Sequence, residues 1–183
     1  MQSMKIHILG APGSGVSSLG KLLAEHLTVP HFDTDDFHWF TDDELPFRRR
    51  RNPEHRRELL SKALNETNDW VLSGALCGWG DVFIPLFDVV LYMWAPREIR
   101  IQRITLREEN RYGKARVDEV GDLHQVFVKF LDWAGSYDEP SGNLRSRESE
   151  KEWMAKLPCP VINLDGMQPL QENLRIVCES LAL

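Results

Sequence analysis

A glycine-rich stretch near the start of the chain has the spacing of a phosphate-binding loop. That pattern is a glycine, four residues of any type, a second glycine, a lysine and a hydroxyl residue. Gly10, Gly15 and Ser17 take three of these places, and Val16 stands where the lysine is expected. Backbone N–H groups and the positive end of a following helix bind phosphate without a side-chain charge. We therefore predict phosphate contacts from Gly10, Gly13, Ser14, Gly15, Val16, Ser17 and Ser18.

A cluster of acids follows the short apolar segment that begins at His31. Hydroxyl and carboxylate oxygens suit Mg²⁺ and its waters, and a carboxylate can also act as a base toward an acceptor hydroxyl. We assign Ser17 and Asp33 to the metal, Asp33 also to the acceptor, and Asp35 to catalysis. The alternative is that the acids only cap a helix or a turn, and this is the role that we give to Asp36.

Arginines recur along one side of a predicted helix over residues 96–112. Five of them fall within an arc of roughly 120° when each residue is advanced by about 100°: Arg97, Arg100, Arg103, Arg107 and Arg111. They could pair with neighbouring glutamates on a solvated surface. They could also hold phosphate, for which a planar, permanently charged guanidinium is suited. We expect Arg100 to bind phosphate, and Arg103 or Arg107 to supply the catalytic cation that the loop lacks.

Three further features are candidates for the site of an acceptor. Arg48 begins a basic run, which could bind a phosphate or carboxylate or could be solvated. Gly74 opens a segment with several glycines, which implies close approach of the backbone or a tight bend. Trp79 lies between two of these glycines, so we place it in the pocket, where it could stack on a base, rather than in a hydrophobic cluster.

The elements that must position these residues follow from the apolar pattern. Short apolar runs predict five strands, over residues 4–10, 31–36, 70–75, 88–95 and 158–166. Helical spacing predicts helices over residues 15–29, 53–68, 96–112, 120–134, 149–157 and 169–183. This alternation predicts an α/β fold of three layers, with a mainly parallel sheet covered on both faces. Ligands of such sheets sit beyond the carboxyl ends of the strands, where the loop and the acids would meet.

Two stretches, about 37–68 and 112–157, interrupt the alternation. We interpret both as helical excursions over the carboxyl edge of the sheet. Arg145 and Arg147 lie in a polar segment of the second stretch and could close as a lid, although solvent exposure is the simpler expectation. A chain of 183 residues with 42% apolar content suits one domain over residues 1–183.

The bulk composition limits the classes of partner. A net charge of −6 argues against a general nucleic-acid binder, because neutralising many phosphates needs a basic surface. Cys77, Cys159 and Cys178 lack paired metal spacing and suit a reducing compartment. No apolar run is long enough to span a bilayer. We therefore expect a cytoplasmic monomer or homodimer that binds a nucleotide and a small molecule, with neither nucleic acid nor membrane as partner.

Taken together, these residues resemble the adenylate kinase-like P-loop nucleoside-phosphate and small-molecule kinases. The supporting segments span nearly the whole chain: Ile6–Gly15, Phe32–Asp36, Val71–Gly74, Val89–Arg100 and Val161–Gly166. The Asp33-Thr34-Asp35 segment is similar to the acidic pair of shikimate- and gluconate-type kinases. The chain is also similar to bacterial proteins described as adenylate kinase-related or AAA-type ATPases.

This resemblance implies a P-loop fold with a five-stranded parallel sheet. It also implies that ATP with Mg²⁺ is the donor, that the first excursion (37–68) binds the acceptor, and that the second (112–157) forms a lid. Two functions stay open. One is a kinase of a small molecule or a nucleoside monophosphate, and the other is a catalytically weak nucleotide-binding or sensing module, which Val16 favours.

Overall fold

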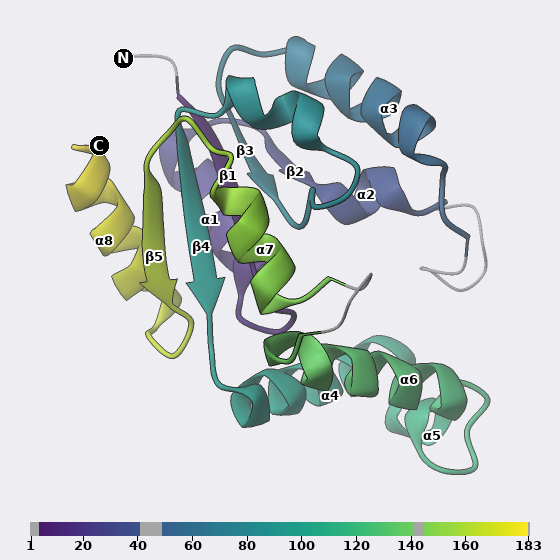
Figure 1. Ribbon diagram of the computed structural model, residues 1–183. Coiled ribbons are helices and arrows are strands. Elements are labelled where there is room, and N and C mark those ends of the chain that lie inside the picture. Colours follow the sequence, from purple (N-terminus) through teal and green to yellow (C-terminus); the bar gives the residue numbers. More distant parts are fainter. Residues whose placement is uncertain (1–3, 41–48, 141–144, 183) are drawn as a thin grey trace.

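A five-stranded parallel sheet lies at the centre of the computed structural model, which describes residues 4–40, 49–140 and 145–182 (Figure 1). The strands are β1 (Lys5–Gly10), β2 (His31–Asp33), β3 (Trp70–Ser73), β4 (Val89–Trp94) and β5 (Val161–Asp165). Their order across the sheet is β2-β3-β1-β4-β5, and every neighbouring pair is parallel. The predicted α/β class and its five parallel strands are confirmed.

Helices cover both faces of the sheet, as the alternating pattern predicts. One face packs against α1 (Val16–Leu27) and α8 (Leu170–Leu181), with Ile6 and Ile8 of β1 in that core. The other face packs against α3 (Pro53–Asn65), the 3-10 helix η1 (Asp81–Leu86) and α7 (Arg147–Met154), with Leu9 in that core. Strands buried on both faces explain why β1, β3 and β4 are nearly continuous apolar runs.

The second strand is shorter than its predicted range of 31–36. It ends at Asp33, and α2 (Thr34–His38) begins at the next residue. The carboxylate of Asp33 accepts a hydrogen bond from the Asp35 amide at 3.1 Å and so caps the new helix. A local side-chain to backbone bond therefore ended the strand earlier than the apolar pattern indicated.

Residues 112–157 do not form a single excursion over the sheet edge. The stretch follows α4 (Arg97–Tyr112) and begins with α5 (Lys114–Val117) and α6 (His124–Gly135), and these three helices lie together beyond the carboxyl end of β4 (Figure 1). A short 3-10 helix, η2 (Ser136–Asp138), leads back toward the sheet. In α7, Trp153 is 2% exposed and its Nε1 donates to Asp81 at 3.0 Å. A buried indole therefore anchors α7 on the sheet in this structure, and the lid over 112–157 stays a prediction.

All three cysteines are free thiols and half-buried. Burial is the main cause that raises the pKa of the Cys77 thiol to about 12, and the charge of Glu150 adds to it. Such a thiol stays protonated and unreactive at neutral pH. Among the described residues, no helix is both long enough and apolar enough to cross a membrane.

Candidate functional site

The loop between β1 and α1 is packed tightly against the end of β4 and the start of α4. Gly10 and Gly13 both have positive φ angles, of 154° and 82°. A Cβ on Gly10 would collide with the Met93 backbone, and one on Gly13 would lie 2.6 Å from the Arg100 carbonyl oxygen. Side chains are excluded at both positions, so the loop follows a path that only glycine allows.

The first turn of α1 presents its backbone N–H groups beside this loop. Gly15 precedes the helix with φ of 108°, and no side chain caps the helix. Ser14 turns its buried hydroxyl back onto the Ala11 carbonyl oxygen at 2.7 Å, so that hydroxyl stabilises the loop itself. Uncapped N–H groups at the positive end of a helix of this length form an anion-binding site.

Val16 is the first residue of α1, and its partly buried side chain packs against the apolar core on the α1 and α8 face. The valine side chain therefore has a packing role in the fold. The loop over residues 10–18 has backbone N–H groups and no charged side chain.

Ser17 and Asp33, predicted as metal ligands, are in direct contact. The hydroxyl of Ser17 donates to Oδ2 of Asp33 at 2.6 Å, which joins the first turn of α1 to the carboxyl end of β2. The same carboxylate caps α2 through its other oxygen, so the cap and the pairing with Ser17 occur together. A hydroxyl and a carboxylate at the mouth of a phosphate loop are the protein oxygens that Mg²⁺ commonly uses beside bound phosphates.

Asp35 lies at the start of α2 and retains exposed surface. Desolvation raises the pKa of its carboxyl, and the negative charge of Asp33 raises it further. The charges of Arg145 and Arg107 and a hydrogen bond from Trp39 act in the opposite direction. A carboxylate whose proton affinity is raised is suited to accept a proton.

Arg100, expected to bind phosphate, instead holds protein groups together. It is fully buried, with Nε donating to the Ala95 carbonyl oxygen at 2.9 Å and Nη1 to that of Ala134 at 2.8 Å. Nη2 is 2.5 Å from the carboxylate of Asp138. Nη1 also lies 3.4 Å from the Pro12 carbonyl oxygen in the loop. The guanidinium thus ties the loop to α4 and α6, and we remove Arg100 from the proposed phosphate ligands.

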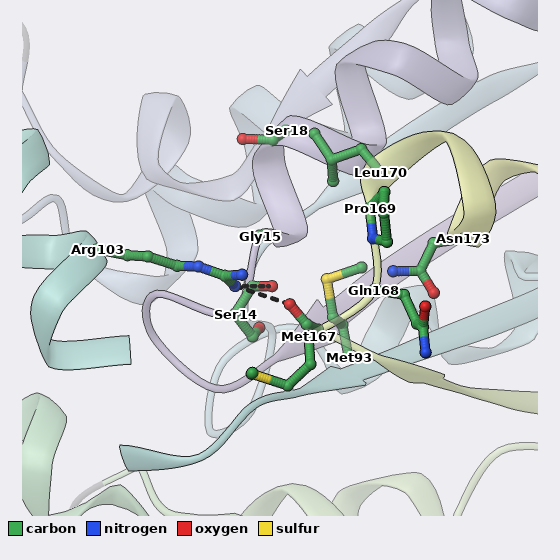
Figure 2. Close-up of a pocket in the computed structure, with 11 residues that line it drawn as sticks. Ser14, Gly15, Ser18, Met93, Arg103, Met167, Gln168, Pro169, Leu170 and Asn173 are labelled. Carbon is green, nitrogen blue, oxygen red and sulfur yellow. Dashed lines mark hydrogen bonds between the residues drawn. The ribbon is translucent and has the colours of Figure 1, made fainter. Parts of the chain in front are cut away.

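Arg103 lies one turn further along α4 and borders a cavity of about 390 Å³ next to the loop (Figure 2). Its Nη1 donates to the Gly166 carbonyl oxygen at 2.8 Å and lies 3.5 Å from that of Ser14. The turn after β5 forms the opposite wall, and Figure 2 shows its Gln168 and Pro169 beside Asn173. The cavity is continuous with the phosphate loop, because Ser14, Gly15 and Ser18 line it as well.

Arg107 faces away from this cavity. Its Nε donates to the buried carboxylate of Glu108 at 2.9 Å, and its guanidinium lies 5.7 Å from the centre of the Phe130 ring. The charge of Arg107 still reaches Asp35, whose pKa it lowers. Arg103 and Arg107 therefore have different contacts, although they share a stripe on α4.

The predicted acceptor residues have mixed outcomes. Arg48 lies outside the described residues. Trp79 is 6% exposed and belongs to the core under α3, with Nε1 donating to the Ala75 carbonyl oxygen at 3.0 Å, so its placement as a stacking surface was wrong. Gly74 has φ of 110°, and a Cβ there would collide with Thr34. The close approach of the backbone that this glycine indicates is therefore an approach to Thr34 of α2, in the same chain.

The sequence interpretation missed Arg145, for which solvent exposure was the simpler expectation. Its Nη2 donates to the Gly10 carbonyl oxygen, at the first glycine of the loop, and its Nε donates to Glu150 at 2.6 Å. The contact joins residues 135 positions apart. No local spacing could have found it, because the return of α7 onto the sheet creates it.

The parallel sheet in the order β2-β3-β1-β4-β5, with a glycine loop at the end of β1, is the arrangement of a P-loop protein. The chain belongs to the AAA domain family, whose model matches residues 6–124. It is 40% identical over 177 residues to the uncharacterized protein YqaC of Bacillus subtilis, and the matched residues cover 97% of each chain.

Other relatives are kinases. The chain is 30% identical to the cytidylate kinase of Halobacterium salinarum, over 63% of this chain and 64% of that one. Its fold is similar to that of shikimate kinase from Bacteroides thetaiotaomicron, with a TM-score of 0.59, 17% identity and coverage of 98% and 99%. These similarities support the P-loop kinase superfamily and do not single out adenylate kinases.

Proposed function

We propose that this protein is a phosphotransferase that moves the terminal phosphoryl group of ATP, bound with Mg²⁺, to a small anionic acceptor. The observation that carries the proposal is the contact between Ser17 and Asp33, with Asp35 at the next turn. It brings a metal-binding pair, a candidate base and a phosphate loop to one edge of the sheet. Such sites work chiefly by positioning and by neutralising charge.

The donor fits between the loop and the turn after β5. Phosphates would lie on the uncapped N–H groups of α1, and the base would enter the cavity lined by Arg103 and the 166–170 turn. A planar guanidinium on the wall of such a cavity can stack on a nucleobase. This assigns Arg103 to the base of the donor rather than to its terminal phosphate.

The residues present fit Mg²⁺ bound with a nucleotide. Within the described residues, no group of three or more His, Cys, Asp or Glu side chains could hold a metal by itself. Mg²⁺ beside phosphates needs only one or two protein oxygens, and Ser17 with Asp33 supplies them. The ion would neutralise charge on the phosphate oxygens, while Asp33 and Ser17 fix its place.

The acceptor would lie beside α2. For a hydroxyl acceptor, Asp35 would take the proton as the acceptor oxygen bonds to phosphorus and the bond to the departing ADP breaks. His38, one turn along α2, has its pKa lowered to about 4 by burial and by the charges of Arg56 and Arg50. These cations create a positive potential next to the candidate base, which favours an anionic acceptor.

The test is phosphoryl transfer from ATP with Mg²⁺ to two sets of acceptors: nucleoside monophosphates, headed by CMP, and small hydroxylated carboxylic acids, headed by shikimate. We expect transfer to a member of one set, and ³¹P NMR identifies the product. Binding of ATP without transfer to any acceptor or to water would contradict the proposal.

A second candidate function is a nucleotide-binding or sensing module with weak catalysis, which the missing lysine at Val16 favours. Val16→Lys separates the two. If the wild type binds ATP without turnover and the variant transfers phosphate, the module is the correct function. If the wild type already transfers phosphate, the lysine is not required and the kinase function holds.

A further inference from the structure

A phosphoryl-transfer site needs a cation next to the terminal phosphate, and the loop of this protein does not carry one. The side chain at the lysine position is Val16, which is partly buried and packs against the apolar core. Backbone N–H groups can hold phosphates but carry no full charge. A cation supplied to a transferring phosphate is worth about 10³–10⁵ in rate, so its source decides whether the site is active.

Arg145 brings a guanidinium to the first residue of the loop. Nη2 donates to the Gly10 carbonyl oxygen and Nε donates to Glu150, so two of its nitrogens are held by protein groups. Among the described residues, Nη1 makes no hydrogen bond. The side chain keeps 25% of its surface exposed, which leaves room for a ligand.

Arg145 contacts the loop, and its charge also acts on the candidate base. Its positive charge lowers the pKa of Asp35, against the effect of desolvation. The terminal phosphoryl group must pass from the loop to an acceptor near Asp35. Arg103 instead donates to Gly166 beside the cavity, and Arg107 pairs with Glu108.

Glu150 fixes the direction in which the guanidinium points. This carboxylate is fully buried and accepts hydrogen bonds from Arg145 and from the Tyr137 hydroxyl. The Tyr137 hydroxyl in turn lies 3.0 Å from that of Tyr92 on β4. A buried ion pair adds little net stability, because desolvation offsets the attraction. What this chain of contacts provides is a guanidinium held in one orientation at the loop.

We propose that Arg145 binds the terminal phosphate of the donor nucleotide and takes the place of the missing loop lysine, with Glu150 as its positioning residue. The inference rests on the proposed function for the identity of the ligand, ATP. Arginine suits this task because its donors can contact a phosphate while others keep their protein partners. The cation is thereby supplied from the segment before α7 rather than from α1.

The test is equilibrium binding of ATP, ADP and AMP, each with Mg²⁺, to the full chain and to Arg145→Met. Loss of a contact to the terminal phosphate should lower the ratio of ATP to AMP affinity by about tenfold to a hundredfold, as for hydrogen bonds to charged groups. Arg147→Met is the matched control, because Arg147 lies over the Trp94 ring and should keep the wild-type ratio. An equal change for all three nucleotides, or no change, overturns the proposal.

Two further variants keep the test decisive if Arg145→Met does not fold. Arg145→Lys should keep part of the preference for ATP, and Glu150→Gln should reduce it while AMP affinity stays constant. Wild-type ratios in both variants would overturn the proposal. Thermal unfolding without ligand shows which variants are folded.

Adding Val16→Lys to Arg145→Met should restore most of the preference for ATP, since both cations would serve the same phosphate. If the double variant does not regain the preference for ATP, the two cations do not serve the same phosphate. The binding ratio does not depend on turnover. If the wild type binds ATP but phosphorylates nothing, the proposed function fails, and the Arg145 proposal is still judged by the ratio.

Discussion

At the scale of single residues, Asp33 both caps a helix and pairs with a hydroxyl beside the loop. One carboxylate oxygen caps α2 and the other accepts the Ser17 hydroxyl. The cap holds the carboxylate in place without using the oxygen that faces α1. Asp35 is then positioned by the helix that Asp33 starts, so the proposed metal ligand and the proposed base are joined by one short turn.

Asp35→Asn should lower the rate of transfer to a hydroxyl acceptor, or to water, by about 10²–10⁴, because a general base contributes that much. The folded-state pKa of Asp35 is raised above 3.8, so the folded protein binds this proton more tightly than the unfolded chain does. Stability conferred by that proton is present at low pH and is lost as the pH rises through the raised pKa. The variant should therefore be more stable than the wild type at pH 7 and equally stable near pH 3.

Initial rates and thermal unfolding across this pH range measure both effects. Asp36→Asn is the matched control: it removes the same charge from the same helix, and the pKa of Asp36 is also raised, by burial and by Asp33. It should leave the transfer rate unchanged. Equal rate losses in the two variants would show that only the charge of α2 matters.

At the scale of elements, three arginines on one side of α4 lie in three different environments. Arg100 points into the protein, Arg103 borders the cavity, and Arg107 pairs with Glu108. Helical spacing places these residues on one side of α4, but the segments that pack against each arginine determine its contacts. The returning α6 and η2 enclose Arg100, because they bring the Ala134 carbonyl and Asp138 over it.

Arg100→Met should lower the free energy of unfolding by about 1–3 kcal/mol for each buried group that loses its donor, and these groups are the carbonyl oxygens of Ala95 and Ala134. Urea denaturation measures this loss. Arg111→Met on the same helix is the control, and its 39% exposed side chain should cost at most about 1 kcal/mol. If Arg100→Met keeps full stability and loses ATP affinity instead, Arg100 is a phosphate ligand after all.

At the scale of the whole molecule, one edge of the sheet collects groups from distant parts of the chain. The loop follows β1, the acids follow β2, and the cavity wall follows β5. Arg145 reaches the same edge from the segment before α7. A nucleotide bound there would contact the loop, α4 and the 166–170 turn at once, and should therefore stabilise the entire fold.

ATP with Mg²⁺ at a hundred times its Kd should stabilise the protein by about 2.7 kcal/mol. For a domain of this size, each kcal/mol raises Tm by about 2–4 °C, so a rise of about 5–10 °C is expected. Adenosine at the same concentration should give a much smaller rise, because it lacks the phosphates that the loop binds. A thermal-shift assay measures both, and an equal rise with adenosine would contradict the role of the loop.

Much of this architecture could be predicted from local patterns. The apolar runs indicated all five strands, and the glycine spacing located a turn whose φ angles and close contacts require glycine. The pairing of Ser17 with Asp33 also followed, because carboxyl ends of parallel strands share one edge. The failures concern side chains whose neighbours are remote in the sequence. Trp79 and Arg100 carry types that suit a ligand, and both are buried among protein groups.

The sequence by itself thus determined the parallel sheet, the glycine turn after β1 and the absence of a lysine at position 16, since each depends on residue type and short spacing. Only the tertiary structure decided which arginine faces the loop. A long, flexible side chain can serve a surface, a core or a ligand, and its role depends on which segments fold against it. Arg145 meets Gly10 because α7 packs on the sheet through Trp153, a contact that no local pattern encodes.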